Sequence, residues 1–123
     1  MKWVRIIKQV RTIRQKGRMS MKKIIDGKRY DTDTAENVAK WGNGLHDGDF
    51  KHVYEKLYRT SKGSWFLHGA GGPMSEYAES NGREKWGGER IIPMTDTEVK
   101  AWLESHDRVE VLEQWFAESI VDA

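Results

Sequence analysis

Histidine and carboxylate side chains are the groups in this chain whose types and spacing would support catalysis or metal binding. The 123 residues include four histidines and no cysteine, which excludes thiolate nucleophiles, disulfides and cysteine-based zinc sites. The segment His46-Asp47-Gly48-Asp49 places one imidazole and two carboxylates together, but a calcium loop needs more oxygen ligands in a defined order. We interpret it as a turn whose Asp side chains bond to their own backbone, and we expect no metal site.

A glycine-rich segment, His68-Gly69-Ala70-Gly71-Gly72, has the composition of the loop that binds the oxyanion in esterases. The chain has no Gly-x-Ser-x-Gly nucleophile elbow and is too short for that fold, so this interpretation lacks its context. We expect these glycines to serve backbone geometry, either a positive φ or the close approach of a short helix at residues 74–80. We predict no catalytic residue and no cofactor, and therefore a protein that is not an enzyme.

Aromatic and basic side chains alternate along a strand that we expect within residues 50–68. One face of this strand carries His52, Tyr54, Lys56 and Tyr58, and Arg59 and Lys62 follow nearby. Such a face could stack the bases of single-stranded nucleic acid. Aromatic residues at alternate strand positions more often pack half-buried against a helix, and we favour that interpretation.

Trp41 and Trp86 each lie beside a glycine in a polar segment. An indole in such a loop either plugs the core or anchors a partner, because Trp is a frequent interface hot spot. Trp65, Trp102 and Trp115 fit core positions better. The predicted partner-binding residues are Trp41, Trp86, Tyr54 and Tyr58, and the expected partner is a protein.

Charge divides the chain into two parts. Of the 21 Lys and Arg side chains, nine lie in residues 1–23, which contain no acid; the other 100 residues hold 12 cations and all 19 acids. Residues 1–20 show an apolar stripe at helical spacing with cations on the other side, which predicts a basic amphipathic helix. The acidic part has a net charge of −7 and could imitate nucleic acid towards a basic partner.

Several roles are open for the basic segment. Its cations would pair with phosphates, so that residues 2–23 bind nucleic acid. The helix would alternatively lie on an anionic membrane surface, dock on a partner or stay solvated. Residues 1–20 would otherwise be an extension upstream of a start at Met21, because Lys16-Gly17-Arg18 is what a purine-rich ribosome-binding sequence encodes. The predicted nucleic-acid-binding residues are Arg5, Lys8, Arg11, Arg14 and Arg18.

Hydrophobic periodicity and turn signals indicate one α+β domain in residues 21–123. Asp26-Gly27 predicts a type I′ turn in a first hairpin, and the second hairpin lies within residues 50–68. Capping-box spacing predicts helix starts at Asp33 and Thr95. We expect a small antiparallel or mixed sheet of the two hairpins plus a strand at 89–94, packed against helices at 33–41, 96–105 and 108–121.

Membrane and export signals are missing from the sequence pattern. No apolar run approaches the roughly 20 residues needed to span a bilayer. Cations interrupt the apolar residues of the N-terminal segment, so a secretory signal is not expected. We expect a cytoplasmic protein without a transmembrane segment.

Three stretches carry a resemblance to a known group of proteins. They are Lys22 to Thr32 (KKIIDGKRYDT), Leu57 to Glu79 (LYRTSKGSWFLHGAGGPMSEYAE) and Gly87 to Met94 (GGERIIPM), with Trp102. Across residues 21 to about 105 the chain resembles a family of small uncharacterised proteins from low-GC Gram-positive bacteria, their phages and mobile elements. The resemblance implies a domain of hairpins and helices, a bacterial or phage origin and a usual start near Met21, but it implies no activity.

The function that we expect is non-enzymatic binding of a macromolecule, in a protein of phage or mobile-element type. Its size, charge and aromatic residues would suit an inhibitor of a host nucleic-acid-handling or defence complex, as anti-CRISPR proteins are. One alternative is an accessory nucleic-acid-binding domain that uses the basic N-terminal helix. A small hydrolase or nuclease is the least favoured alternative.

Overall fold

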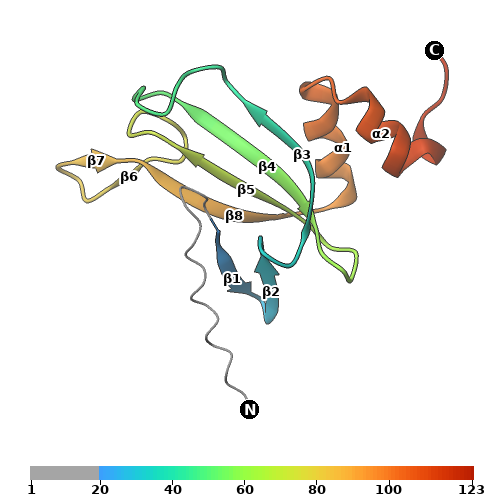
Figure 1. Ribbon diagram of the computed structural model, residues 1–123, viewed down its shortest axis with the longest axis horizontal. Helices are drawn as coiled ribbons and strands as arrows, with labels where there is room; N and C mark the ends of the chain where they lie inside the picture. The colour runs from blue at the N-terminus through green and yellow to red at the C-terminus, as the bar shows by residue number, and fades with distance from the viewer. Residues whose placement is uncertain (1–19) are drawn as a thin grey trace.

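An antiparallel sheet of four strands lies at the centre of the protein, whose computed structural model describes residues 20–123. Its strands are β3 (Glu36–Gly42), β4 (Val53–Arg59), β5 (Trp65–Gly71) and β8 (Gly88–Met94), in that order across the sheet. Two small sheets accompany it: β1 (Lys22–Ile25) pairs with β2 (Lys28–Asp31), and β6 (Glu79–Ser80) with β7 (Lys85–Trp86). Helices α1 (Asp96–Ser105) and α2 (Val109–Phe116) follow, with a 3-10 turn at Ala117–Ser119 (Figure 1).

The α+β class and the antiparallel pairing predicted from the sequence are confirmed. The first hairpin forms a separate two-stranded sheet instead of joining the main one, which corrects the prediction of a single sheet. The predicted basic helix lies outside the described residues, apart from residue 20. The same holds for its proposed nucleic-acid-binding residues Arg5, Lys8, Arg11, Arg14 and Arg18.

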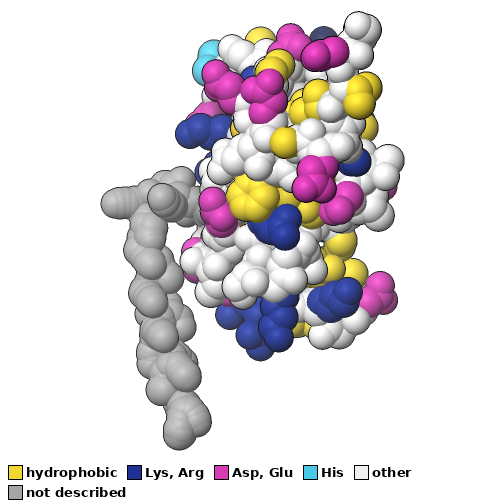
Figure 2. Space-filling model, turned by 90° about the vertical axis from the view of Figure 1, so that its right-hand side faces the viewer, with side chains coloured by type: hydrophobic (Ala, Val, Ile, Leu, Met, Phe, Trp, Pro, Cys, Tyr) yellow, Lys and Arg dark blue, Asp and Glu magenta, His cyan; other side chains and the backbone are white. Residues whose placement is uncertain are grey.

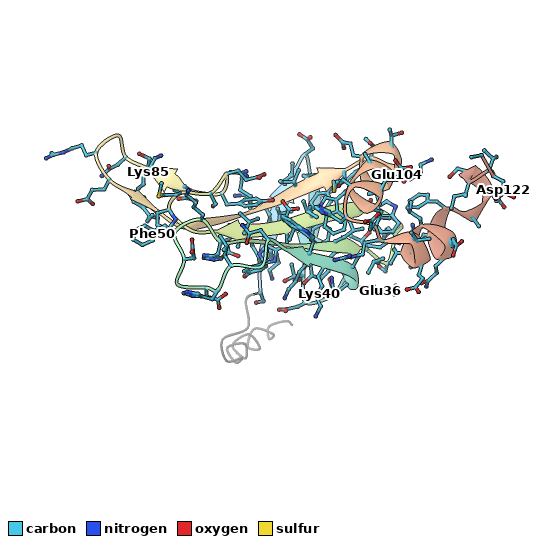
Figure 3. The ribbon with its side chains drawn as sticks, turned by 90° about the horizontal axis from the view of Figure 1, so that it is seen from above. Glu36, Lys40, Phe50, Lys85, Glu104 and Asp122 are labelled. Atoms are coloured by element: carbon cyan, nitrogen blue, oxygen red, sulfur yellow. The ribbon has the colours of Figure 1, made fainter. Side chains whose placement is uncertain are left out.

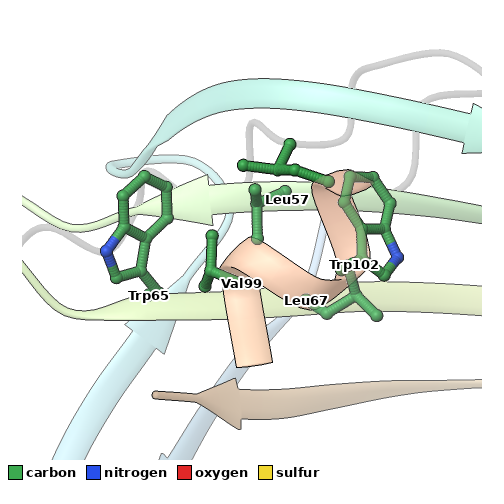
Figure 4. Packing of buried hydrophobic residues seen from close by; sticks show 6 residues of the cluster. Leu57, Trp65, Leu67, Val99 and Trp102 are labelled. Atoms are coloured by element: carbon green, nitrogen blue, oxygen red, sulfur yellow. The ribbon is translucent and has the colours of Figure 1, made fainter. Parts of the chain in front are cut away.

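The helices and the β1–β2 hairpin cover opposite faces of the four-stranded sheet. Side chains of consecutive strand residues point to opposite faces, so Leu57 faces the helices and Tyr58 faces the hairpin. The helix-side core consists of Leu57, Trp65, Leu67, Val99, Trp102 and Leu103 (Figure 4). The hairpin-side core consists of Tyr30, Tyr58, Phe66 and Ile91. Core positions are thereby confirmed for Trp65 and Trp102, and Trp115 packs against the helix-side core.

Local sequence signals correctly fix two of these elements. Asp26 and Gly27 have φ angles of 53° and 79°, as a type I′ turn requires at both central residues. At the start of α1, the Thr95 side chain accepts a hydrogen bond from the Glu98 amide, and the Glu98 carboxylate accepts one from the Thr95 amide. This capping box satisfies backbone donors that the first helical turn leaves open.

The helix predicted at residues 33–41 is wrong, because this segment forms a turn and the edge strand β3. A bulge between Asn37 and Ala39 inserts one residue into the strand. Val38, Ala39 and Trp41 consequently all pack against the helix-side core, and their uneven spacing imitates the apolar stripe of a helix. The predicted cap is also absent, since the Asp33 amide donates to the Asp31 carboxylate in a local turn.

The short helix predicted at residues 74–80 is wrong too, because this segment consists of turns followed by β6. The Ser75 hydroxyl donates to the Gly72 carbonyl and accepts from the Tyr77 amide. Such local side-chain bonds offer the backbone an alternative to helical hydrogen bonds. Tyr77 is therefore free to turn inward, where it is 1% exposed.

The last helix is shorter than the predicted range of 108–121, since α2 ends at Phe116 and a 3-10 turn follows. Its aromatic residues Trp115 and Phe116 both contact the Trp65 ring, at centroid distances of 5.5 and 5.8 Å. Within residues 20–123, neither helix has the length and apolar character that crossing a bilayer demands.

Candidate protein-binding surface

Three exposed apolar side chains gather at the end of the sheet that lies away from the helices. They are Phe50, Met74 and Trp86, with 62%, 59% and 45% of their surface exposed. Phe50 comes from the β3–β4 loop, Met74 from the segment after β5, and Trp86 from the β6–β7 hairpin (Figure 1). Figure 3 shows Phe50 and Lys85, the neighbour of Trp86, at this same end. We call Phe50, Met74 and Trp86 the loop-end surface.

Backbone hydrogen bonds join two of the three loops, and a close glycine contact brings the third beside them. The Met74 amide donates to the Phe50 carbonyl at 2.8 Å, and the Gly72 amide donates to the His52 carbonyl at 3.0 Å. The glycines allow this close contact, because a Cβ on Gly72 would lie 2.5 Å from the Phe50 carbonyl oxygen. A Cβ on Gly87 would lie 2.7 Å from the Gly71 carbonyl oxygen. The loop-end surface is therefore a fixed feature of the fold.

The glycine-rich segment after Leu67 serves close approach, one of the two roles predicted for it. A Cβ on Gly69 would overlap the Tyr77 ring, and one on Gly71 would lie 2.8 Å from the His52 carbonyl oxygen. Neither glycine has a positive φ, so the other predicted role is wrong for this segment. The close neighbour is the turn segment that contains Tyr77, and not a helix.

A buried carboxylate connects this end of the sheet to helix α1. The Tyr77 hydroxyl donates a hydrogen bond to Glu55 Oε2. Trp102 Nε1 donates one to Glu55 Oε1, at 2.8 Å. Burial raises the pKa of Tyr77, and the hydrogen bond to Glu55 raises it further, so the phenol keeps its proton. The Arg90 guanidinium covers the outer side of the Tyr77 ring at 4.8 Å. These contacts hold the segment that carries Met74.

The loop at residues 46–49 forms a turn, as the sequence predicts. The Asp49 carboxylate accepts a hydrogen bond from the Lys51 amide, and His46 Nδ1 accepts one from the Gly48 amide. Within the described part of the chain, no group of three or more His, Asp or Glu side chains is placed to hold a metal ion.

An imidazole–carboxylate pair that sequence reasoning missed lies on the hairpin-side face of the sheet. His68 Nε2 and Glu89 Oε1 are 2.7 Å apart, joined across β5 and β8. A cavity of about 350 Å³ next to Glu89 is lined also by Asp47, His52 and Tyr54. Burial, followed by the charges of Glu89 and Asp47, raises the pKa of Tyr54 to about 12.

This pair supports a structural role better than a catalytic one. The His68 side chain is 1% exposed, whereas that of Glu89 is 36% exposed. Among the described residues His68 Nδ1 has no hydrogen-bond partner. A general base must reach its substrate within hydrogen-bond distance, and this ring is covered on all sides. The proximity of His68 and Glu89 follows from the register in which β5 pairs with β8. Their separation along the sequence does not reveal that register.

The four predicted partner-binding residues do not lie on one surface. Trp86 is exposed at the loop end, as its prediction requires. Trp41 is half-buried on the helix side, where it stacks on His106 at a centroid distance of 4.3 Å. Tyr58 is 7% exposed and stacks on Phe66 at 5.1 Å, so it is a core residue and not a platform for bases. Tyr54 is half-buried on the same face as Tyr58.

Phe50 and Met74 are the members of the surface that the sequence analysis missed. Each is a single large apolar residue between turn-forming residues, Asp49 before Phe50 and Pro73 before Met74. That pattern was a usable signal, since a lone apolar side chain in a polar loop has no strand or helix to bury it. Their proximity to Trp86 depends on long-range packing.

Comparisons with models of protein families, with curated proteins and with solved structures find no match to this chain. The family resemblance of the KKIIDGKRYDT, LYRTSKGSWFLHGAGGPMSEYAE and GGERIIPM stretches therefore stays a prediction.

Proposed function

We propose that the protein is a binding protein that docks on a protein partner through the loop-end surface. The observation that carries this proposal is that Phe50, Met74 and Trp86 are exposed on three loops whose backbones adjoin at the same end of the sheet. Large apolar side chains that are exposed together commonly mark interaction sites, and Trp is enriched among interface hot spots.

The fixed loops favour binding because little order has to be gained on association. The hydrogen bonds around Phe50 and the glycine contacts at Gly72 and Gly87 hold the surface in one shape before a partner arrives. An interface that is already ordered loses less conformational entropy when it binds.

The charges around the surface favour a protein over a nucleic acid. Both signs occur at its rim, with exposed Lys51 and Lys85 beside exposed Glu76 and Glu84. A phosphate backbone needs a row of cations, whereas a mixed polar rim around an apolar centre is typical of protein interfaces.

A more specific version of this proposal is that the protein inhibits the partner it binds, as anti-CRISPR proteins do. Residues 95–123, which contain both helices, have eight acidic and two basic side chains. Such an acidic end would suit a partner complex that carries a basic nucleic-acid channel. Protein binding through the loop-end surface does not depend on whether the protein is an inhibitor.

The proposal is tested by capture from a bacterial lysate treated with nuclease, followed by identification of the captured protein. The bait is the full chain, compared with a loop-end variant, Phe50→Ser/Met74→Ser/Trp86→Ser. The control bait is Ile24→Ser/Val121→Ser, because these apolar residues are 60% and 85% exposed but lie outside the loop-end surface.

We expect one protein to be retained by the wild-type and control baits and lost from the loop-end bait. Equal capture by all three baits would contradict the proposal, and so would a protein that is captured only from a parallel lysate without nuclease. We expect the thermal midpoints of both variants to stay close to that of the wild type, since exposed side chains contribute little to stability.

A further inference from the structure

A cavity with basic and hydroxyl side chains in its lining lies between the β1–β2 hairpin and the β4–β5 turn, at the opposite end of strands β4 and β5 from the loop-end surface. Its volume is about 500 Å³, within the range of small-molecule sites. Lys28 and Arg29 line it from the hairpin, and Ser61, Lys62 and Ser64 line it from the turn. Figure 2 shows Lys and Arg side chains gathered at the lower end of the molecule, where Figure 1 places these segments.

The positive charge of this cavity is not neutralised within the described part of the chain. No ion pair in residues 20–123 joins Lys28, Arg29 or Lys62 to a carboxylate. The carboxylate that lines the cavity belongs to Asp31, and its Oδ1 accepts a hydrogen bond from the Asp33 amide. The cavity thus presents three cations and one acid that is engaged in a local turn.

Hydroxyl groups on a fixed turn complete the donor set. The Thr60 side chain accepts from the Ser64 amide at 3.0 Å, and the Gly63 amide donates to the Thr60 carbonyl at 2.9 Å. Gly63 has a φ of +91°, which lets the turn close. Across residues 20–123 no hydrogen bond engages the hydroxyls of Ser61 or Ser64.

We propose that this cavity binds the phosphate group of a small phosphorylated molecule. Phosphate oxygens accept several charge-assisted hydrogen bonds at once, and a guanidinium can donate two in parallel. Lys28, Arg29 and Lys62 supply the charge, and the serine hydroxyls supply neutral donors. A hollow with its donors converging suits a compact ligand better than a long backbone, which would need cations along a track.

This site goes beyond the proposed protein binding, because it uses different residues at the other end of the sheet. Its test is an NMR chemical-shift titration of the full chain with pyrophosphate, with inorganic phosphate, and with sodium chloride at matched ionic strength. The cavity variant is Lys28→Gln/Arg29→Gln/Lys62→Gln. The control variant, Lys40→Gln/Lys51→Gln/Lys85→Gln, removes the same charge from exposed residues that neither line the cavity nor lie in the segment 2–23.

We expect saturable shifts at residues 28–31 and 60–64 with pyrophosphate and, more weakly, with phosphate. The cavity variant should lose at least about tenfold in affinity, as loss of charge-assisted bonds predicts, and the control variant less than about threefold. Shifts that are spread over all cationic residues, that chloride reproduces, or that survive in the cavity variant would overturn the proposal.

An oligonucleotide arm separates the two sources of phosphate. A short single-stranded DNA is titrated into the same three proteins. Binding through residues 2–23, if present, would be equal in the wild type and the cavity variant. DNA binding that is much tighter than pyrophosphate binding and is lost in the cavity variant would assign the cavity to nucleic acid and overturn the choice of a small ligand.

Discussion

Glu55 is the residue that links the loop end of the sheet to the helices. Its two carboxylate oxygens accept hydrogen bonds from Tyr77 and from Trp102, which lie in different parts of the chain. A buried polar group of this kind stabilises a fold only while all its partners are present. The contact therefore makes the position of the loops dependent on the packing of α1.

We predict that Glu55→Leu lowers the free energy of unfolding by about 2 to 4 kcal/mol, whereas Glu55→Gln lowers it by about 1 kcal/mol. Leucine leaves the Trp102 and Tyr77 donors unpaired. Glutamine can accept from the indole and donate its amide to the phenol oxygen, because a hydroxyl is both donor and acceptor. Urea unfolding of both variants measures the difference, and equal destabilisation would show that the hydrogen bonds contribute little.

His106 is the group through which we expect the fold to respond to mild acid. Burial against Trp41 and Trp102 lowers its pKa, the Arg108 charge lowers it further, and Glu55 acts in the opposite direction. Below its ordinary value of 6.5, the unfolded chain takes up a proton that the folded protein resists. The stability associated with His106 is thus complete above that pH and is lost as the pH falls through the lowered pKa.

We expect the wild type to lose more unfolding free energy than His106→Gln between about pH 7.5 and about pH 5.5. The glutamine cannot titrate in this range, so its contribution to the pH dependence disappears. Chemical denaturation at the two pH values gives the comparison. A steeper loss in the variant would mean that the charged imidazole is favoured in the folded protein.

At the scale of elements, the capping box of α1 is the local signal with the clearest energetic consequence. Thr95→Ala removes the side-chain acceptor of the Glu98 amide and should cost about 1 kcal/mol of stability. Thr97→Ala is the control, because Thr97 is exposed in the helix and Ala has the higher helix propensity. Thermal unfolding of the pair should show a lower midpoint for Thr95→Ala alone; equal midpoints would refute the capping role.

Elements whose signals are local could be predicted from the sequence, and those decided by tertiary packing could not. The Asp26-Gly27 turn and the Thr95 cap depend on residues next to one another, and both predictions are confirmed. The β3 strand depends on pairing with β4 and on a bulge, so its apolar residues imitate a helix in the sequence. The turn at Ser75 depends on a hydrogen bond from the Ser75 hydroxyl to the Gly72 carbonyl, which competes with the backbone hydrogen bonds of a helix.

The candidate site was predictable only in part for the same reason. Trp86 stands out in the sequence as an indole in a polar segment, and it is exposed in the structure. Its neighbours Phe50 and Met74 lie 36 and 12 positions earlier, and glycine contacts between loops bring the three together. Tyr58 was predicted to bind a partner but is buried. Alternation along a strand shows which residues share a face, but it does not show which face the β1–β2 hairpin covers.

At the scale of the whole molecule, the sheet separates surfaces of different chemistry. The loop-end surface lies at one end of β4 and β5, and the cationic cavity lies beside their turn at the other end. The acidic helices cover one face. The two proposed sites share no residue, so we expect occupation of one to leave the other accessible.

The central claim is that the loop-end surface binds a protein, and the affinity for the purified partner tests it most directly. Isothermal titration of that partner into the wild type and into Phe50→Ser/Met74→Ser/Trp86→Ser gives the two dissociation constants. Loss of two or three hot-spot side chains should weaken binding at least about 100-fold, whereas Ile24→Ser/Val121→Ser should change it less than about threefold. Equal affinity of the wild type and the loop-end variant would contradict the claim.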